Sequence, residues 1–208
     1  MNEPYSSLSE TLARIDELCA ACGISPADEL NVQDLVYNTG ISAEDVQALL
    51  AGREVNDQGA DARVRSRVTF LYETRMDLDN LPADISKIAA AIEATPVWTK
   101  RLVSGEAKPS IVTGHSLAKF YGVPAGFLTD SPADALTREL QSVVFDLEVR
   151  AEPEKKLKDL GVRHITGRSP GWSKDQLVEV AKMVQGIALD LQRVGNIVAR
   201  MEEQEDHR

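Results

Sequence analysis

The stretch "ISKIAAAIEATPVWTKRLVSGEAKP" occupies residues 85–109, and a related stretch, "VQDLVYNTGISAEDVQALLAGREVN", occupies residues 32–56. The two align without a gap at an offset of 53 residues, and the alignment extends back to Arg14 and Arg67. Apolar positions meet apolar positions, and helix-cap residues meet helix-cap residues. Such self-similarity predicts that one structural unit is present twice in the chain. The matched pairs include Ile15 and Val68, Leu18 and Leu71, Leu35 and Ile88, Ser42 and Thr95, Leu49 and Leu102, and Gly52 and Gly105.

Both copies are predicted to be helical, because apolar residues recur about every 3.6 positions and no segment alternates as a strand does. In the second copy, Asp84 is suited to cap a short helix that ends near Ile92. Thr95 is suited to cap the next helix, with Pro96 at its first position, and Gly105 is suited to end it. The predicted fold class is all-α, with tandem helix-turn-helix-like units of four or five helices followed by a long C-terminal dimerisation helix.

The net charge of −10 is unusual for a protein that binds nucleic acid, so the distribution of the charge matters. Residues 1–60 hold 2 Lys and Arg residues against 11 Asp and Glu residues, whereas residues 61–130 hold 9 against 8. Residues 131–208 hold 12 against 14. The acidity is therefore concentrated in the first copy, and the second copy is close to neutral.

Residues 88–130, "IAAAIEATPVWTKRLVSGEAKPSIVTGHSLAKFYGVPAGFLTD", carry a resemblance to a known family. Four motifs match the family: the Ile-Ala of the first helix, the Leu-x-Ser-Gly at the end of the second helix, the Leu-Ala-x-Phe-Tyr-Gly-Val-Pro that follows, and the Phe-Leu after it. On these motifs the chain resembles the lambda-repressor-like (XRE) helix-turn-helix transcriptional regulators, in particular an actinobacterial branch with a C-terminal dimerisation region. The segment "GVRHITGRSPGWSKDQLVEVAKMV", from Gly161, is similar to the C-terminal element of that branch, so the resemblance covers roughly residues 65–190.

The repeat, the charge distribution and the resemblance together predict three regions: a degenerate acidic helix-turn-helix-like repeat at 1–60, a lambda-repressor-like DNA-binding domain at 61–130 and a C-terminal helical dimerisation region at 131–208. In such domains the second helix of the pair enters the major groove of DNA. Two positions depart from the family pattern, since Thr99 replaces a common apolar residue and Val103 replaces a frequent Arg. Lys87 and Lys108 are expected to neutralise phosphates. The residues expected to face the groove are Thr95, Val97, Trp98, Thr99, Lys100 and Arg101.

The equivalent helix of the first copy carries Glu44, Asp45 and Gln47 where the second carries Val97, Trp98 and Lys100. Its carboxylates would face DNA phosphates spaced at one charge per roughly 1.7 Å of duplex axis. The first copy is therefore expected to stay off DNA. It would either cover apolar surface of the second copy or dock a protein partner.

Beyond Ser173 the sequence runs "SKDQLVEVAKMVQGIALDLQRVGNIVARMEEQ", and Ser173 with Gln176 has the pattern of a capping box. Apolar residues then recur at alternating spacings of three and four, which is typical of a helix that packs along a narrow stripe. We expect this seam to join two chains as a homodimer; the alternative is an intramolecular bundle with a helix at residues 135–149. The seam residues are Leu177, Val180, Val184, Ile187, Leu191, Val194, Val198 and Met201.

No catalytic site, metal site or cofactor is expected from the sequence, because the three histidines are scattered and no phosphate-binding loop or nucleophile elbow occurs. Cys19 and Cys22 share one helix face and are expected to be core residues rather than zinc ligands or a redox pair. The N-terminus lacks the pattern of a secretory signal, and the apolar runs are too short to span a membrane. A cytoplasmic, nucleoid-associated protein without membrane contact is expected.

Together these patterns predict a sequence-specific transcriptional regulator that binds double-stranded DNA as a homodimer. The alternative is a protein-interaction module that keeps the helix-turn-helix fold and no longer binds DNA.

Overall fold

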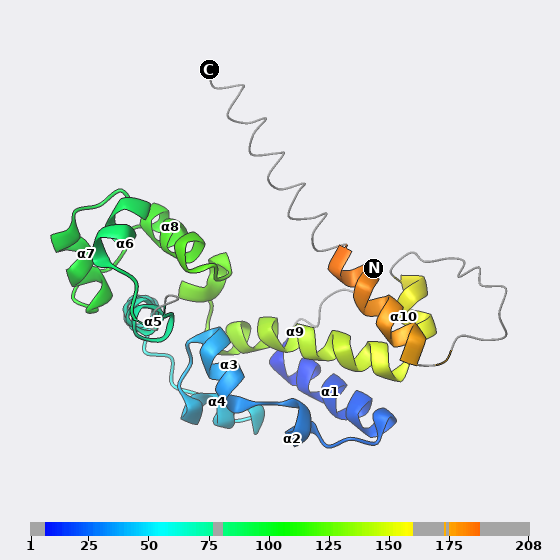
Figure 1. Cartoon of the computed structure of the whole chain (residues 1–208). Coiled ribbons are helices and arrows are strands. Elements are labelled where there is room, and N and C mark those ends of the chain that lie inside the picture. Colours follow the sequence, from blue (N-terminus) through cyan, green and yellow to red (C-terminus); the bar gives the residue numbers. More distant parts are fainter. Residues whose placement is uncertain (1–6, 77–80, 160–172, 174, 188–208) are drawn as a thin grey trace.

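The computed structural model describes residues 7–76, 81–159, 173 and 175–187 (Figure 1). The described residues are helical apart from turns, loops and one isolated β-bridge between Met76 and Pro82, which confirms the all-α fold class. A helix also covers residues 175–187. The other elements are α1 (Leu8–Cys22), α2 (Pro26–Glu29), α3 (Val32–Thr39), α4 (Ala43–Leu50), α5 (Ala60–Thr74), α6 (Ile85–Ala91), α7 (Pro96–Val103), α8 (Ile111–Tyr121), the 3-10 helix η1 (Ala125–Leu128), α9 (Pro132–Ala151) and α10 (Pro153–Asp159).

The helix caps of the two copies match at the offset of 53 residues. The Ser42 hydroxyl accepts a hydrogen bond from the backbone N–H of Asp45 at 3.1 Å, and the Thr95 hydroxyl accepts one from that of Trp98 at 3.3 Å. Asn31 and Asp84 likewise cap α3 and α6 with their side chains. These caps satisfy N–H groups that have no partner inside the helix.

The turn between the paired helices has a residue with positive φ at the same position in both copies. Gly40 follows α3 with a φ of 67°, and Glu93, which occupies the equivalent position, has a φ of 53°. Glu93 is the one non-glycine residue with a positive φ in the described ranges. A non-glycine side chain in this left-handed region costs about 1–2 kcal/mol. The second copy adopts this conformation even though it has Glu93 where the first copy has a glycine.

The second unit, α5 to η1, has a core of its own. α5 packs on α7 and η1, while α6 packs on α7 and α8. Trp98, Phe120 and Tyr121 are partly buried and pack against the outside of this core. The buried residues are Val68, Leu71, Ile88, Ile92, Leu102, Val103, Leu117, Phe127 and Leu128.

The first copy, in contrast, completes its core with α9, which lies along α1 in Figure 1. Polar contacts reinforce this packing: Arg14 donates to Glu148 at 3.3 Å, and Asn38 donates to Glu139 at 2.7 Å. Cys19 lies in this core as expected, whereas Cys22 is only partly buried. We call α1–α4 together with α9 the first unit. Its buried residues are Ile15, Leu18, Cys19, Leu35, Ile41, Val46 and Leu49 with Ala135, Leu136, Leu140, Val144 and Leu147.

The predicted division of the chain therefore needs a correction. A boundary at residue 131 separates α9 from α1 and α3, on which it packs. The second copy is inserted between the first copy and the helix that closes it. A sequence of 60 residues with three short helices after α1 does not enclose its own apolar faces, and α9 supplies the missing surface.

The two units meet where the end of α3 lies against α5 and η1. A Cβ atom placed on Gly40 would lie 2.9 Å from Cζ of Phe127 and 3.3 Å from Cγ of Arg67. Nearby, Arg75 donates to the backbone oxygen of Tyr37 at 2.8 Å, and its guanidinium lies 3.5 Å from the centre of the Tyr37 ring. The first copy thus covers one apolar side chain of the second core, Phe127.

We predict that Gly40→Ala destabilises the protein by at least about 2 kcal/mol, because a left-handed backbone cost of about 1 kcal/mol adds to overpacking against Phe127. Gly52→Ala is the control, since Gly52 has a φ of 70° and open space around the added Cβ atom. It should lose only about 1 kcal/mol. Urea unfolding measures both, and equal losses would contradict the close contact.

We also predict that a fragment of residues 59–130 unfolds cooperatively by itself, whereas residues 1–58 alone do not fold. Joining residues 1–58 to 131–159 through a Gly/Ser linker should restore cooperative unfolding, because α9 returns to the first core. Far-UV circular dichroism during thermal unfolding distinguishes these cases. A folded 1–58 fragment would show that α9 is dispensable.

Candidate nucleic-acid interface

The outer face of α7 carries exposed basic and apolar side chains. Val97 is 76% exposed, and Lys100 and Arg101 are also exposed. Positions three and four apart share one face of a helix, so these three side chains form one patch. Thr95, the N-cap, is exposed beside them. The structure therefore brings four of the six residues expected to face the groove onto the same open surface.

Thr99 and Trp98 do not belong to this open patch. Thr99 is completely buried, and its hydroxyl donates to the backbone oxygen of Thr95 at 3.0 Å. The prediction that Thr99 contacts DNA is wrong, because α7 packs that side chain against the core, where its counterpart in the first copy is the buried Val46. Trp98 is partly buried against the same core, and only part of its ring is open to a ligand.

The cations around α7 differ in how freely they can meet a phosphate. Lys100 and Lys87 are exposed, and neither forms an ion pair with a described carboxylate. The Nε atom of Arg101 lies 3.5 Å from an oxygen of Glu106, with both side chains largely exposed. Ion pairs of this kind contribute about 0–1 kcal/mol, so a phosphate or a base can replace the carboxylate.

Lys108, just beyond α7, is held by the start of α5. Its ammonium lies 2.8 Å from a carboxylate oxygen of Asp61, and this hydrogen bond lowers the pKa of Asp61. Both side chains are about half exposed or more. The predicted phosphate contact by Lys108 therefore requires exchange of Asp61 for the phosphate.

The equivalent face of the first copy has the opposite character. On α4, Glu44 and Gln47 are exposed, and Asp45 accepts a hydrogen bond from the Ser42 hydroxyl at 2.8 Å. The same backbone thus presents carboxylates at one site and cations at the other.

Sequence reasoning missed two exposed apolar residues at the start of α8, a few residues after Lys108. α8 begins at Ile111, and Ser110 caps it. Ile111 is 94% exposed and Val112 is 76% exposed. The signal was present in the sequence, because Ser110 is a favoured N-cap residue.

The predicted dimerisation seam is described only in its first half. Ser173 and Gln176 form the expected capping box, with reciprocal hydrogen bonds of 3.0 and 3.3 Å. Leu177 is buried with Val149 and Leu157 of the same chain, and Val180 packs beside them, whereas Ile187 is 58% exposed. The start of the seam thus makes the intramolecular contacts that the alternative interpretation describes. Val184 is partly buried, and Leu191, Val194, Val198 and Met201 lie outside the described residues.

Comparisons with known proteins give no match: no protein-family model, no curated protein and no solved structure corresponds to this chain. Across the described ranges, no three His, Cys, Asp or Glu side chains are grouped so as to hold a metal ion. No helix in the part of the chain that the structure describes has the length and apolar character to cross a membrane.

We predict that Thr99→Val changes the free energy of unfolding by less than about 1 kcal/mol, since Val46 occupies the equivalent site and the Thr95 oxygen keeps its bond from the residue 99 N–H. Thr99→Asp should destabilise by more than about 2 kcal/mol, because it buries a carboxylate without a partner. Thermal and urea unfolding test both. A harmless Thr99→Asp would show that this side chain is not in the core.

Proposed function

We propose that this protein is a sequence-specific DNA-binding transcriptional regulator of the lambda-repressor-like (XRE) type. The observation that carries the proposal is the open patch of Thr95, Val97, Lys100 and Arg101 at a capped helix that follows a tight turn. This is the position from which a recognition helix reaches base edges. The acidic outer face of α4 makes the first copy unsuited to the same task.

The chemistry of the patch suits the major groove. Lys100 and Arg101 can donate to the O6 and N7 atoms of guanine, and Val97 can contact a thymine methyl group. Lys87 on α6 and Lys108 after α7 flank the patch and can contact phosphates on either side. Arg101 and Lys108 exchange carboxylate partners for DNA as they bind.

A homodimer would present two such helices to two half-sites one helical turn, about 34 Å, apart. The exposed Met183 and Ile187, 62% and 58% exposed, continue the helix that begins at the Ser173 capping box and support a second chain there. Binding of two linked sites raises the overall affinity far above that of one site.

One observation favours a different function, that of a protein-interaction module. Two of the predicted DNA contacts, Arg101 and Lys108, already pair with Glu106 and Asp61, and the first copy is strongly acidic. A module that no longer binds DNA would keep these pairs. The two proposals differ in whether any duplex is bound.

We predict that Lys100→Ala combined with Arg101→Ala abolishes retardation of genomic DNA fragments in gels. Both side chains are exposed, so the fold should be unchanged by circular dichroism. The matched control is Lys155→Ala with Lys158→Ala, which removes the same charge from exposed positions on α10. The control should bind as the wild type does. Equal losses in both variants would show that only the total charge matters.

Binding should weaken steeply between 50 mM and 200 mM salt, because bound cations displace counterions from DNA. Lys87→Ala should reduce the slope of log affinity against log salt by about 1. If the wild-type protein shows no salt-dependent binding to any duplex at 50 mM salt, the interaction-module proposal replaces this one.

We predict that a chain ending before Ser173 is monomeric by multi-angle light scattering, whereas the full chain is a dimer. Ile187→Glu in the full chain is a milder test, because the exposed Ile187 is not needed by the described core. It should weaken association without unfolding the protein. An unchanged dimer mass after truncation would refute the seam.

A further inference from the structure

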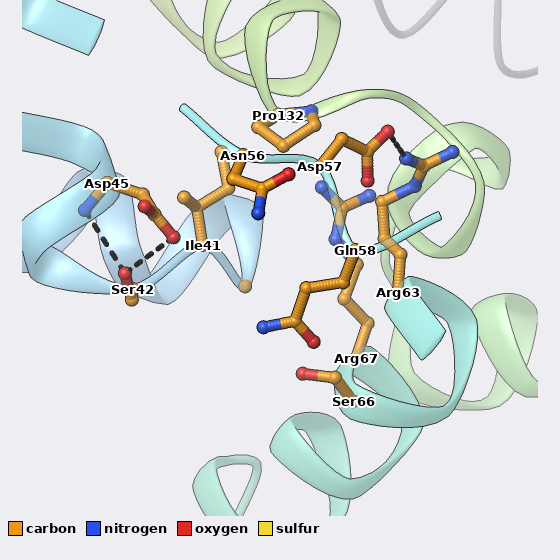
Figure 2. Close-up of a pocket in the computed structure, with 11 residues that line it drawn as sticks. Ile41, Ser42, Asp45, Asn56, Asp57, Gln58, Arg63, Ser66, Arg67 and Pro132 are labelled. Atoms are coloured by element: carbon orange, nitrogen blue, oxygen red, sulfur yellow. Dashed lines mark hydrogen bonds and ion pairs between the residues drawn. The ribbon is translucent and has the colours of Figure 1, made fainter. Parts of the chain in front are cut away.

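A polar pocket of about 160 Å³ lies at the junction of the two units (Figure 2). Ser42 and Asp45 line it from the first unit, whereas Ser66 and Arg67 line it from the second unit. The loop that joins α4 to α5 contributes the amide side chains of Asn56 and Gln58. This volume is below the roughly 300–1,000 Å³ of pockets that hold drug-sized ligands, so the pocket suits a small molecule.

Arg67 is an unusual residue for this position. Its side chain is almost fully buried, with 2% of the residue exposed, and a buried charge normally has a partner of opposite charge. One terminal nitrogen donates to the backbone oxygens of Phe127 and Asp130 at 2.6 and 2.8 Å. Its other N–H groups have no partner among the described residues, and no described carboxylate forms an ion pair with it.

The neighbouring charges do not neutralise Arg67. Arg63 forms an ion pair with Asp57, and Arg138 forms one with Asp130. Asp57, which also lines the pocket, and Asp130 are therefore already engaged by other arginines. Burial lowers the pKa of Arg67 to about 10, so it remains a cation at neutral pH. The second-unit side of the pocket thus holds one positive charge that no described carboxylate pairs with.

Asp45 supplies the complementary charge on the first-unit side. It accepts a hydrogen bond from the Ser42 hydroxyl at 2.8 Å and forms no ion pair with a described cation. Figure 2 shows Ser42 and Asp45 on one side of the pocket and Arg63, Arg67 and Ser66 on the other. The pocket therefore has a separated pair of opposite charges with donors and acceptors between them.

We propose that this pocket binds a free amino acid, with the ligand carboxylate on Arg67 and the ligand ammonium on Asp45. A simple anion would meet repulsion from Asp45, and a simple cation would meet repulsion from Arg67. A zwitterion satisfies both charges and fits the volume. The ligand would bridge α4 of the first unit and α5 of the second. This proposal does not depend on DNA binding.

The test is isothermal titration calorimetry of the full chain with each of the common L-amino acids in turn. At least one should bind saturably, and at least tenfold more tightly than the matching carboxylic acid without the amino group or the matching amine without the carboxylate. If no amino acid binds, or if one of the single-charge analogues binds equally well, the proposal is overturned.

Two variants locate the binding. Asp45→Asn keeps the size of the side chain and removes its charge, and Ser66→Trp fills the pocket from an exposed position. Each should weaken binding at least tenfold while leaving the circular dichroism spectrum unchanged. The control is Glu44→Gln, an exposed carboxylate on the same helix outside the pocket lining, which should bind like the wild type. Undiminished binding by Asp45→Asn or Ser66→Trp would place the ligand elsewhere and refute the site.

Discussion

In both units, the turn between the paired helices sets where the second helix of the pair, α4 or α7, begins. A residue with positive φ, Gly40 or Glu93, is followed two positions later by a side-chain N-cap, Ser42 or Thr95. This combination fixes the angle at which α4 and α7 leave the turn, and it directs the apolar face of each helix into its core. The outer face is then free to vary. The same backbone consequently carries a cationic patch in one copy and an acidic one in the other.

The two units differ more in how their cores are closed than in the turn between the paired helices. The second copy ends with α8 and η1, which complete its core locally, whereas the first copy relies on α9 from beyond the second copy. This arrangement places the whole second unit, α5 to η1, between the two parts of the first unit in sequence. It also creates a junction at which Gly40 touches Phe127 and a buried arginine faces a small pocket. The contact between the units is thus made by the end of α3 in the first unit and by α5 and η1 in the second unit.

Much of the fold was predictable from sequence because caps and helix ends are local. Asp84, Thr95 and Gly105 stand at the predicted positions, since their preference for helix termini needs no tertiary information. The packing of α9 on α1 and the burial of the Thr99 side chain depend on contacts between segments that are distant in sequence. A single sequence does not specify such contacts. For the same reason the buried Arg67 gave no signal: at position 67 an arginine on a helix is ordinarily a solvated residue. The outer face of α7 was predictable through its spacing and its resemblance to a known family.

We propose that α7, and not α4, contacts double-stranded DNA. The most direct measurement is nuclear magnetic resonance of the ¹⁵N-labelled full chain, titrated with a duplex taken from a bound genomic fragment. Amide shifts concentrated at residues 95–108, with α4 unperturbed, are the predicted result. Shifts centred on α4, or no shifts at any residue at low salt, would contradict the account.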